Sequence, residues 1–143
     1  MNVASILSFK GRDVITIQPH RTVGEAAKAL ADKGVGAVVV CGADGDVRGI
    51  LSERDIVRAI AKEGAAALEA PVSRHMTSKV VTTHPEASVE RLMEQMTQHR
   101  FRHMPVIENG RLAGVVSIGD VVKWHVEEID HERVAMRDYI AHT

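Results

Sequence analysis

The residues of this sequence best suited to chemistry lie in a Ser-x-x-Asp pattern that occurs twice. Ser52 and Asp55 form the first copy, and Ser117 and Asp120 form the second. Each copy stands where an apolar, strand-like run gives way to a helix-like stretch. The first N–H groups of a helix are unpaired and carry partial positive charge, which suits a phosphate, and a serine hydroxyl adds a donor. An ionised Asp can accept both hydroxyls of a ribose, so the pattern suits a nucleotide.

The same pattern has a purely structural interpretation. Serine is a common N-cap, and an acidic residue in the first turn favours the helix dipole. The repetition does not separate the two interpretations, because a cap could be duplicated as well as a binding site. Both remain open from the residues alone.

A second candidate is the basic cluster that precedes the apolar run at Met104 and Pro105. It contains Arg100, Arg102 and His103. Arginine can grip phosphate oxygens with two parallel hydrogen bonds, although the cluster could also be a solvated helix end. The corresponding first-half segment is Gly34-Val35-Gly36-Ala37-Val38. Its glycines would let the backbone approach a flat base, or would only allow tight packing.

Other kinds of chemistry find little support, and we expect neither catalytic residues nor a metal site. His99 and His103 are four residues apart, but no cysteine or acidic cluster completes a ligand set. Neither Ser52 nor Ser117 has a histidine at a fixed local spacing or lies in a Gly-x-Ser-x-Gly elbow. The phosphate-loop and dinucleotide-binding motifs are missing as well, so a nucleotide site would have to be created between larger elements.

Those elements form an internal repeat of about fifty residues. Residues 14–19 (VITIQP) match residues 80–85 (VVTTHP). Apolar residues at helical spacing follow each proline, with Thr22 and Ser88 as the predicted N-caps. Only the first helix is expected to complete a capping box, through Glu25.

Strand-like runs and tight turns complete each copy. Asp44-Gly45 and Asn109-Gly110 predict two hairpins. The predicted order is strand, helix, strand, hairpin, strand, helix, performed twice. Because one three-stranded sheet with two helices leaves apolar surface uncovered, we expect the two copies to pack sheet to sheet into one core, with a ligand cleft between them.

Composition limits the remaining possibilities. The 143 residues are 45% hydrophobic and 26% charged, with a formal net charge of -1. This predicts a single globular α/β (α+β) domain with no membrane segment and no general affinity for nucleic acid. The single Cys41 and the absence of an export signal at the amino terminus favour the cytoplasm.

In this order, the motifs resemble those of a CBS-domain pair, also called a Bateman module, of the small stand-alone type. The resemblance covers about Val3 to His131. It rests on residues 81–85 (VTTHP), 102–106 (RHMPV) and 110–117 (GRLAGVVS) with Asp120, echoed by residues 49–52 (GILS) with Asp55.

The resemblance implies two tandem repeats related by a pseudo-two-fold axis, at 8–66 and 76–131, followed by a C-terminal tail at 132–143. It also implies homodimers and a regulatory role in which AMP, ADP, ATP or NAD reports energy or redox status to an unidentified regulated protein. The alternatives are S-adenosylmethionine as ligand, or a dimerising interaction module whose ligand sites have degenerated.

By matching position, the resemblance also implies roles for individual residues. Asp55 and Asp120 would hold ribose hydroxyls, and Ser52, Arg54 and Ser117 would contact phosphate. Arg102 and His103 would face the phosphates across the cleft. The base would be bordered, largely through backbone, by Thr16, Thr82, Ala37 and Met104, next to Gly36, Val38 and Pro105. Gly119 stands where the first repeat has Arg54, and the first repeat lacks a counterpart of Pro105, so the two clefts are expected to differ.

Overall fold

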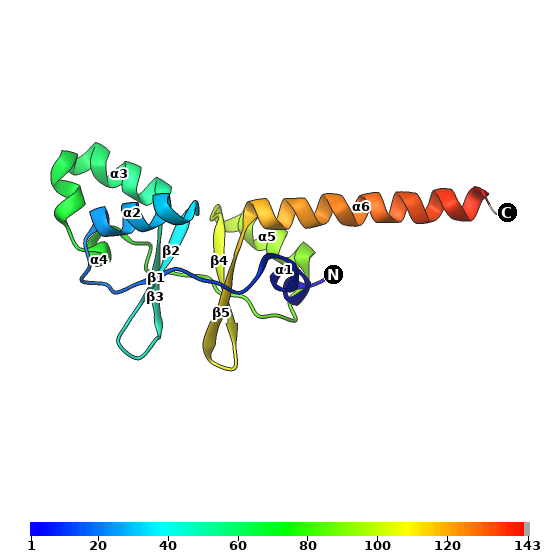
Figure 1. Ribbon diagram of the computed structural model, residues 1–143, viewed down its shortest axis with the longest axis horizontal. Coiled ribbons are helices and arrows are strands. Elements are labelled where there is room, and N and C mark those ends of the chain that lie inside the picture. Colours follow the sequence, from blue (N-terminus) through cyan, green and yellow to red (C-terminus); the bar gives the residue numbers. More distant parts are fainter. Residues whose placement is uncertain (142–143) are drawn as a thin grey trace.

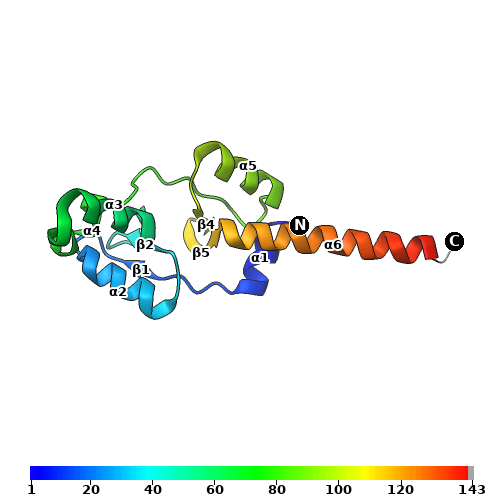
Figure 2. The ribbon, with the colours of Figure 1, turned by 90° about the horizontal axis from the view of Figure 1, so that it is seen from above.

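Two small sheets lie side by side in the middle of the molecule, and helices cover their outer faces (Figures 1 and 2). The computed structural model describes residues 1–141. The first repeat contains β1 (Thr16–Ile17), α2 (Val23–Lys33), β2 (Ala37–Cys41), β3 (Val47–Ser52) and α3 (Glu53–Glu63). The second contains α5 (Val89–His99), β4 (His103–Glu108), β5 (Arg111–Ser117) and α6 (Ile118–Ala141). The predicted α/β fold of two tandem repeats is confirmed.

The two sheets differ in their number of strands. In the first sheet, β1 pairs in parallel with β2, which pairs antiparallel with β3. The second sheet contains only β4 and β5, and the predicted third strand is reduced to one bridge between Thr83 and Val106. The expectation of three strands in each repeat is therefore wrong for the second.

Pro105 explains the missing strand. In the first repeat the N–H of Val39 donates to the carbonyl of Ile15 at 3.0 Å. The strand registers, Ala37 opposite Ser52 and His103 opposite Ser117, place Pro105 at the position of Val39. Proline has no N–H, so the equivalent bond cannot form.

Local signals in the sequence predicted the caps and turns well, with one exception. The hydroxyls of Thr22 and Ser88 accept from the N–H groups three residues later, both at 3.1 Å. Asn109 and Gly110 both adopt positive φ, 52° and 75°, as a tight hairpin turn requires. The exception is Glu25, whose side chain pairs with Arg21 and does not return to the N-cap of its own helix. The capping box predicted there is not formed.

Each repeat has its own hydrophobic core, so the expectation of one shared core is also wrong. The first core gathers Val23, Leu30, Val38 and Leu51, and the second gathers Leu92, Met96, Met104 and Val116. A βαββα unit closes its own core when a further helix covers the open side of its sheet. Two short helices, each of which precedes one βαββα unit in the chain, supply that cover.

These covering helices are exchanged between the repeats. Helix α1 (Val3–Lys10) precedes the first repeat in sequence, yet its Val3, Ile6 and Leu7 are buried in the second core. Helix α4 (Val72–His75) follows the short 3-10 helix η1 (Gly64–Glu69) and precedes the second repeat, yet its Val72 is buried in the first core. Matching bridges, Asn2 with Ser88 and Pro71 with Thr22, fix both helices at equivalent places.

Helix α6 continues without a break past the expected start of the tail at residue 132 and projects away from the body (Figure 1). Residues 142–143 of that tail lie outside the described residues. Within the described part of the chain, no helix combines the length and apolar character needed to cross a membrane.

Candidate functional site

Both Ser-x-x-Asp patterns form reciprocal capping boxes where a strand meets a helix. At the first junction, the N–H of Ser52 donates to Oδ2 of Asp55 at 2.9 Å, and the N–H of Asp55 donates to Oγ of Ser52 at 3.3 Å. At the second, the corresponding distances for Ser117 and Asp120 are 2.9 and 3.2 Å. The structural interpretation of the pattern is therefore confirmed at both junctions, and any ligand role must be compatible with it.

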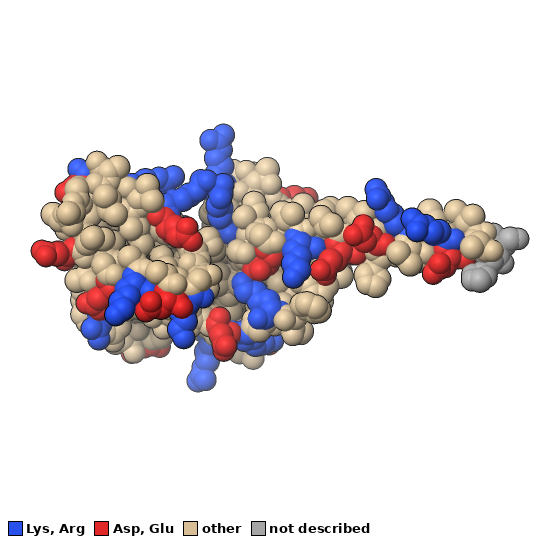
Figure 3. Space-filling model, turned by 45° about the horizontal axis from the view of Figure 1, so that its top comes forward, with Lys and Arg blue, Asp and Glu red and all other residues tan. Residues whose placement is uncertain are grey.

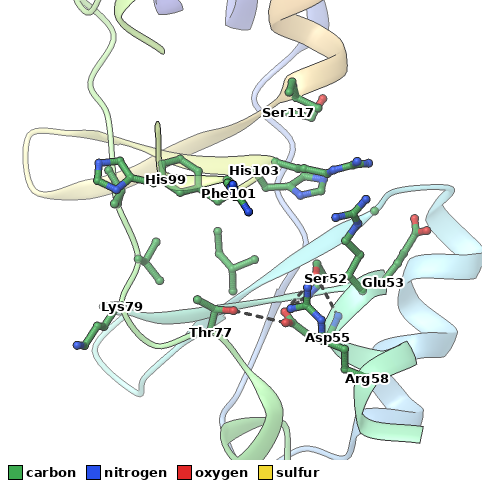
Figure 4. Close-up of a pocket in the computed structure, with 18 of the residues that line it drawn as sticks. Ser52, Glu53, Asp55, Arg58, Thr77, Lys79, His99, Phe101, His103 and Ser117 are labelled. Atoms are coloured by element: carbon green, nitrogen blue, oxygen red, sulfur yellow. Dashed lines mark hydrogen bonds between the residues drawn. The ribbon is translucent and has the colours of Figure 1, made fainter. Parts of the chain in front are cut away.

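A cavity of about 710 Å³ opens between the two repeats beside the first junction (Figure 4). We call it the Asp55 cleft. Its volume is within the usual range for a small-molecule site. It is lined by Gly36, Ile50, Ser52, Glu53, Arg54, Asp55, Arg58, Thr77, Lys79, Val80, Val81, His99, Arg100, Phe101, Arg102, His103, Ser117, Ile118 and Gly119.

Asp55 presents one carboxylate oxygen that the capping box does not use. The box occupies Oδ2, whereas among the described residues Oδ1 accepts only a long bond of 3.4 Å from the hydroxyl of Thr77. Thr77 is held there because its backbone exchanges two hydrogen bonds with Ile50 across an antiparallel bridge. The carboxylate is thus oriented by its helix and still has acceptor capacity on the cleft side.

The cleft carries an excess of positive charge. Five of its lining residues are basic (Arg54, Arg58, Lys79, Arg100 and Arg102), and only Glu53 and Asp55 are acidic. None of the five basic side chains forms an ion pair within residues 1–141. Figure 3 shows Lys and Arg side chains gathered where the two repeats meet. Unpaired cations in a cavity favour an anionic ligand.

Aromatic and apolar side chains line other parts of the same cleft. The rings of His99 and Phe101 stack with centroids 5.8 Å apart and planes inclined by 10°. Ile50, Val80 and Val81 provide aliphatic surface. The cleft therefore offers an apolar area for a flat ring beside polar and charged groups.

His103 lies in the cleft close to Gly36. A Cβ atom on Gly36 would be 3.2 Å from Nε2 of His103 and 3.1 Å from Oε1 of Glu53. The pKa of His103 is lowered, first by burial and then by the charge of Lys10, with a smaller lowering effect of Arg102, whereas Glu53 and Asp120 act in the opposite direction. His103 is therefore mainly neutral at pH 7.

The carboxylate of the second junction is contacted by α1. Lys10, at the end of that helix, donates a short hydrogen bond to Oδ2 of Asp120. Burial alone would raise the pKa of Asp120, but the bonds from Lys10 and Ser117 outweigh it and the pKa is lowered. Leu7 packs so closely that a Cβ on Gly114 would be 2.8 Å from its Cδ2. Phe9 meets Trp124 edge to face, with centroids 5.2 Å apart.

The cleft brings together about half of the predicted site residues. Those that line it are Gly36, Ser52, Arg54, Asp55, Arg102, His103, Ser117 and Gly119. Thr16 instead lines a wider cavity beside the hairpin turns, and Thr82 is exposed without lining the cleft. Ala37 is also outside the lining, Val38 and Met104 belong to the cores, and Pro105 is buried. Asp120 is paired with Lys10.

Sequence reasoning missed several lining residues. Glu53 and Arg58 are on the same helix as Asp55, so helical spacing could have indicated Arg58, four residues after Arg54. Thr77 and Lys79 lie in the segment between the repeats, which contains no motif. No group of three or more metal-ligating side chains is found among the described residues.

Comparisons with known proteins agree on the kind of module. The model of the CBS domain matches residues 6–62 and 72–127. A mitochondrial CBS domain-containing protein of Arabidopsis thaliana is 40% identical, over 96% of this chain and 71% of its own length. A CBS-domain containing protein from Agrobacterium tumefaciens has a crystal structure that is 54% identical and superposes with a TM-score of 0.83, over 85% of this chain and 91% of that one.

A second similar structure contains a nucleotide. It is a CBS domain protein from Pyrobaculum aerophilum complexed with AMP, 31% identical, with a TM-score of 0.75 over 84% of this chain and 89% of that one.

Proposed function

The chain belongs to the CBS-domain family, and on that premise we propose that it is a regulatory module that binds an adenine nucleotide in the Asp55 cleft and catalyses no reaction. The observation that carries the proposal is the cleft itself, where an oriented carboxylate faces an apolar area and five basic side chains that form no ion pair within residues 1–141. AMP in the similar protein from Pyrobaculum aerophilum supports the ligand class.

Each part of a nucleotide has a complementary group in the cleft. The ribose hydroxyls would donate to Oδ1 of Asp55, replacing the long bond from Thr77. The phosphates would meet Arg54 and Arg58 from one repeat and Arg102 from the other. The base would lie against Ile50, Val81 and Phe101.

The charge of the cleft favours nucleotides over S-adenosylmethionine. S-adenosylmethionine carries a sulfonium cation and no phosphate, so it would not neutralise the unpaired basic side chains. AMP, ADP, ATP and NAD all carry phosphate and remain candidates within the proposed class.

Ligand binding would couple the two repeats. Because each repeat has its own core, their relative packing can change without unfolding either core. A ligand that contacts Asp55 on one side and Arg102 on the other would favour the arrangement that it bridges. Only such a difference in affinity between two arrangements can transmit a signal to a regulated protein. A cytoplasmic homodimer is part of the proposal.

Isothermal titration calorimetry of the purified protein with AMP, ADP, ATP, NAD and S-adenosylmethionine tests the site. We expect at least one phosphate-bearing ligand to bind at one per chain. Asp55→Asn should weaken that affinity by about tenfold or more, because a charge-assisted acceptor is worth roughly 1.5–3 kcal/mol. A ligand present at 100 times its Kd should also stabilise the fold by about 2.7 kcal/mol.

Asp120→Asn is the matched control, because it changes the same capping box at the second junction. It should leave the affinity unchanged and cost at least as much stability as Asp55→Asn, because it also weakens the ion pair with Lys10. Equal binding by the Asp55 and Asp120 variants would contradict the assigned site. If none of the ligands binds, the alternative of a dimerising interaction module with degenerate sites gains support.

A further inference from the structure

Arg100 has a backbone conformation that arginine seldom adopts. It follows the last residue of α5, and its φ of 59° and ψ of 32° lie in the left-handed region. Within residues 1–141 the only other non-glycine residue with positive φ is Asn109, which occupies a hairpin turn where asparagine is favoured. Arg100 has no such local reason, because a left-handed position at the end of a helix usually holds glycine.

The first repeat provides a matched case. Gly34 follows α2 as Arg100 follows α5, with φ and ψ of 64° and 37°. In both repeats the N–H of this residue donates to the carbonyl four residues earlier, that of Leu30 or Met96. The two helix ends therefore have the same shape, and glycine adopts it without the steric cost of a Cβ atom.

Attraction to the helix dipole does not explain the arginine. A basic residue inside the last turn gains the same attraction with ordinary helical φ and ψ, as Lys33 does in α2. His99 already occupies that position in α5. A costly conformation that is kept without a local benefit indicates a function for the side chain.

The turn that contains Arg100 belongs to the Asp55 cleft. His99, Arg100 and Phe101 all line the cleft, whereas residues 33–35 lie outside its lining. The rings of His99 and Phe101, the two neighbours of Arg100, stack on each other (Figure 4). Arg100 forms no ion pair within residues 1–141. The strained position thus supplies the cleft with a guanidinium group that has no anionic partner in the chain.

The cleft contains more positive charge than a nucleoside monophosphate needs. Five basic and two acidic residues line it, an excess of three positive charges with His103 counted as neutral. The phosphate of AMP carries about two negative charges at pH 7, so positive charge would remain uncompensated. Each further phosphate adds negative charge. The charge balance therefore favours a nucleotide with two or three phosphates.

We propose that Arg100 is a specificity-determining residue of the Asp55 cleft, which contacts a phosphate beyond the first and favours nucleoside di- and triphosphates over AMP. This inference rests on the proposed nucleotide function. Arg54, Arg58 and Arg102 serve the phosphate that all the candidate nucleotides share. The planar guanidinium of Arg100 suits a further phosphate, because it can donate two parallel hydrogen bonds to its oxygens.

Isothermal titration calorimetry with AMP, ADP and ATP, without added divalent cations, tests the selectivity. The wild type should bind ADP or ATP more tightly than AMP. Arg100→Gly should weaken the ATP affinity by about tenfold and the AMP affinity by less than about twofold. Arg100→Lys should retain part of the ATP affinity, because it keeps the charge. Arg91→Ala is the matched control, since Arg91 is an exposed arginine of the same helix that lies outside the lining of the cleft, and it should leave both affinities unchanged.

The outcomes separate this inference from the proposed function. If the wild type prefers AMP, or if Arg100→Gly weakens AMP and ATP equally or not at all, the role of Arg100 is overturned and the nucleotide site stands. If the wild type binds none of the three nucleotides, the proposed function fails and the role of Arg100 fails with it.

Thermal denaturation of the ligand-free variants distinguishes the side chain from the backbone. Arg100→Gly should melt at a higher temperature than Arg100→Ala, because only alanine keeps a Cβ in the left-handed conformation. Gly34→Ala should lower the melting temperature by a similar difference, since a Cβ there meets nothing within 4 Å. Both Arg100 variants lack the guanidinium and should lose the same ATP affinity. A loss of affinity in Arg100→Ala alone would show that the backbone determines binding, and would overturn the inference.

Discussion

The two strand-to-helix junctions have the same local structure and different surroundings. Both hold a serine and an aspartate in a reciprocal capping box. At Asp55 the covering helix α4 ends at His75, and the chain after it pairs with β3 and leaves a cleft open. At Asp120 the preceding helix α1 continues to Lys10, which binds the carboxylate. The duplicated motif fixes the shape of each junction, and the covering helix decides whether a ligand can reach it.

The largest expected effect comes from the aligned glycines behind the two junctions. A Cβ on Gly49 would be 2.6 Å from the backbone carbonyl oxygen of Thr77, whereas a Cβ on Gly114 would meet only the end of the Leu7 side chain. Gly49→Ala should therefore lower the free energy of unfolding by about 2–3 kcal/mol, and Gly114→Ala by about 1 kcal/mol or less. Urea denaturation measures both. If both variants lose the same free energy of unfolding, the backbone at Thr77 and the side chain of Leu7 move aside equally easily, and the expected difference is wrong.

A smaller effect is expected at the ion pair of the second junction. Lys10→Met should lower the free energy of unfolding at pH 7 by at most about 1 kcal/mol, because both partners are partly exposed. The lowered pKa of Asp120 means that its contribution is present above the unfolded-state value of 3.8 and is lost as pH falls through the folded-state value. Urea denaturation from pH 7 to pH 2.5 should show a shallower acid loss in the variant. If wild type and variant lose the same stability between pH 7 and pH 2.5, the role of Lys10 is contradicted.

The smallest effect concerns His103, which faces both junctions. Its lowered pKa means that the unfolded chain binds a proton more readily, so stability should fall slightly as pH drops below the unfolded-state value of 6.5. His103→Gln should remove this part of the pH dependence. Thermal denaturation of the ligand-free protein between pH 7.5 and pH 5.5 compares the two. If the melting temperatures of wild type and variant change with pH in the same way, protonation of His103 does not destabilise the folded protein.

Local patterns in the sequence predicted the duplicated elements, because caps, hairpin turns and apolar spacing depend on near neighbours. The turn at Asn109-Gly110 and the junctions at Ser52 and Ser117 belong to this class. The exchange of α1 and α4 was not predictable in the same way, since each short helix begins one repeat and packs in the core of the other. The missing strand beside Pro105 could have been inferred from the sequence, because proline has no backbone N–H to donate to a neighbouring strand.

The candidate site was predicted less completely than the fold. Asp55, Arg102 and His103 line the cleft, as their motifs indicated. The ion pair of Asp120 with Lys10 joins residues 110 positions apart, and no motif connects them. Thr77 and Lys79 enter the cleft only because the chain pairs with β3 there. Contacts of this kind follow from the path of the chain between repeats.

The exchanged helices also determine the order in which the chain can fold during synthesis. The first repeat is synthesised before Val72, which completes its hydrophobic core. Until α4 emerges from the ribosome, one side of that core stays exposed. The second repeat is synthesised after its covering helix α1, so that helix is already available when the repeat emerges. A fragment that holds only one βαββα unit would lose the helix that covers its core, so we expect the two repeats to fold as one unit.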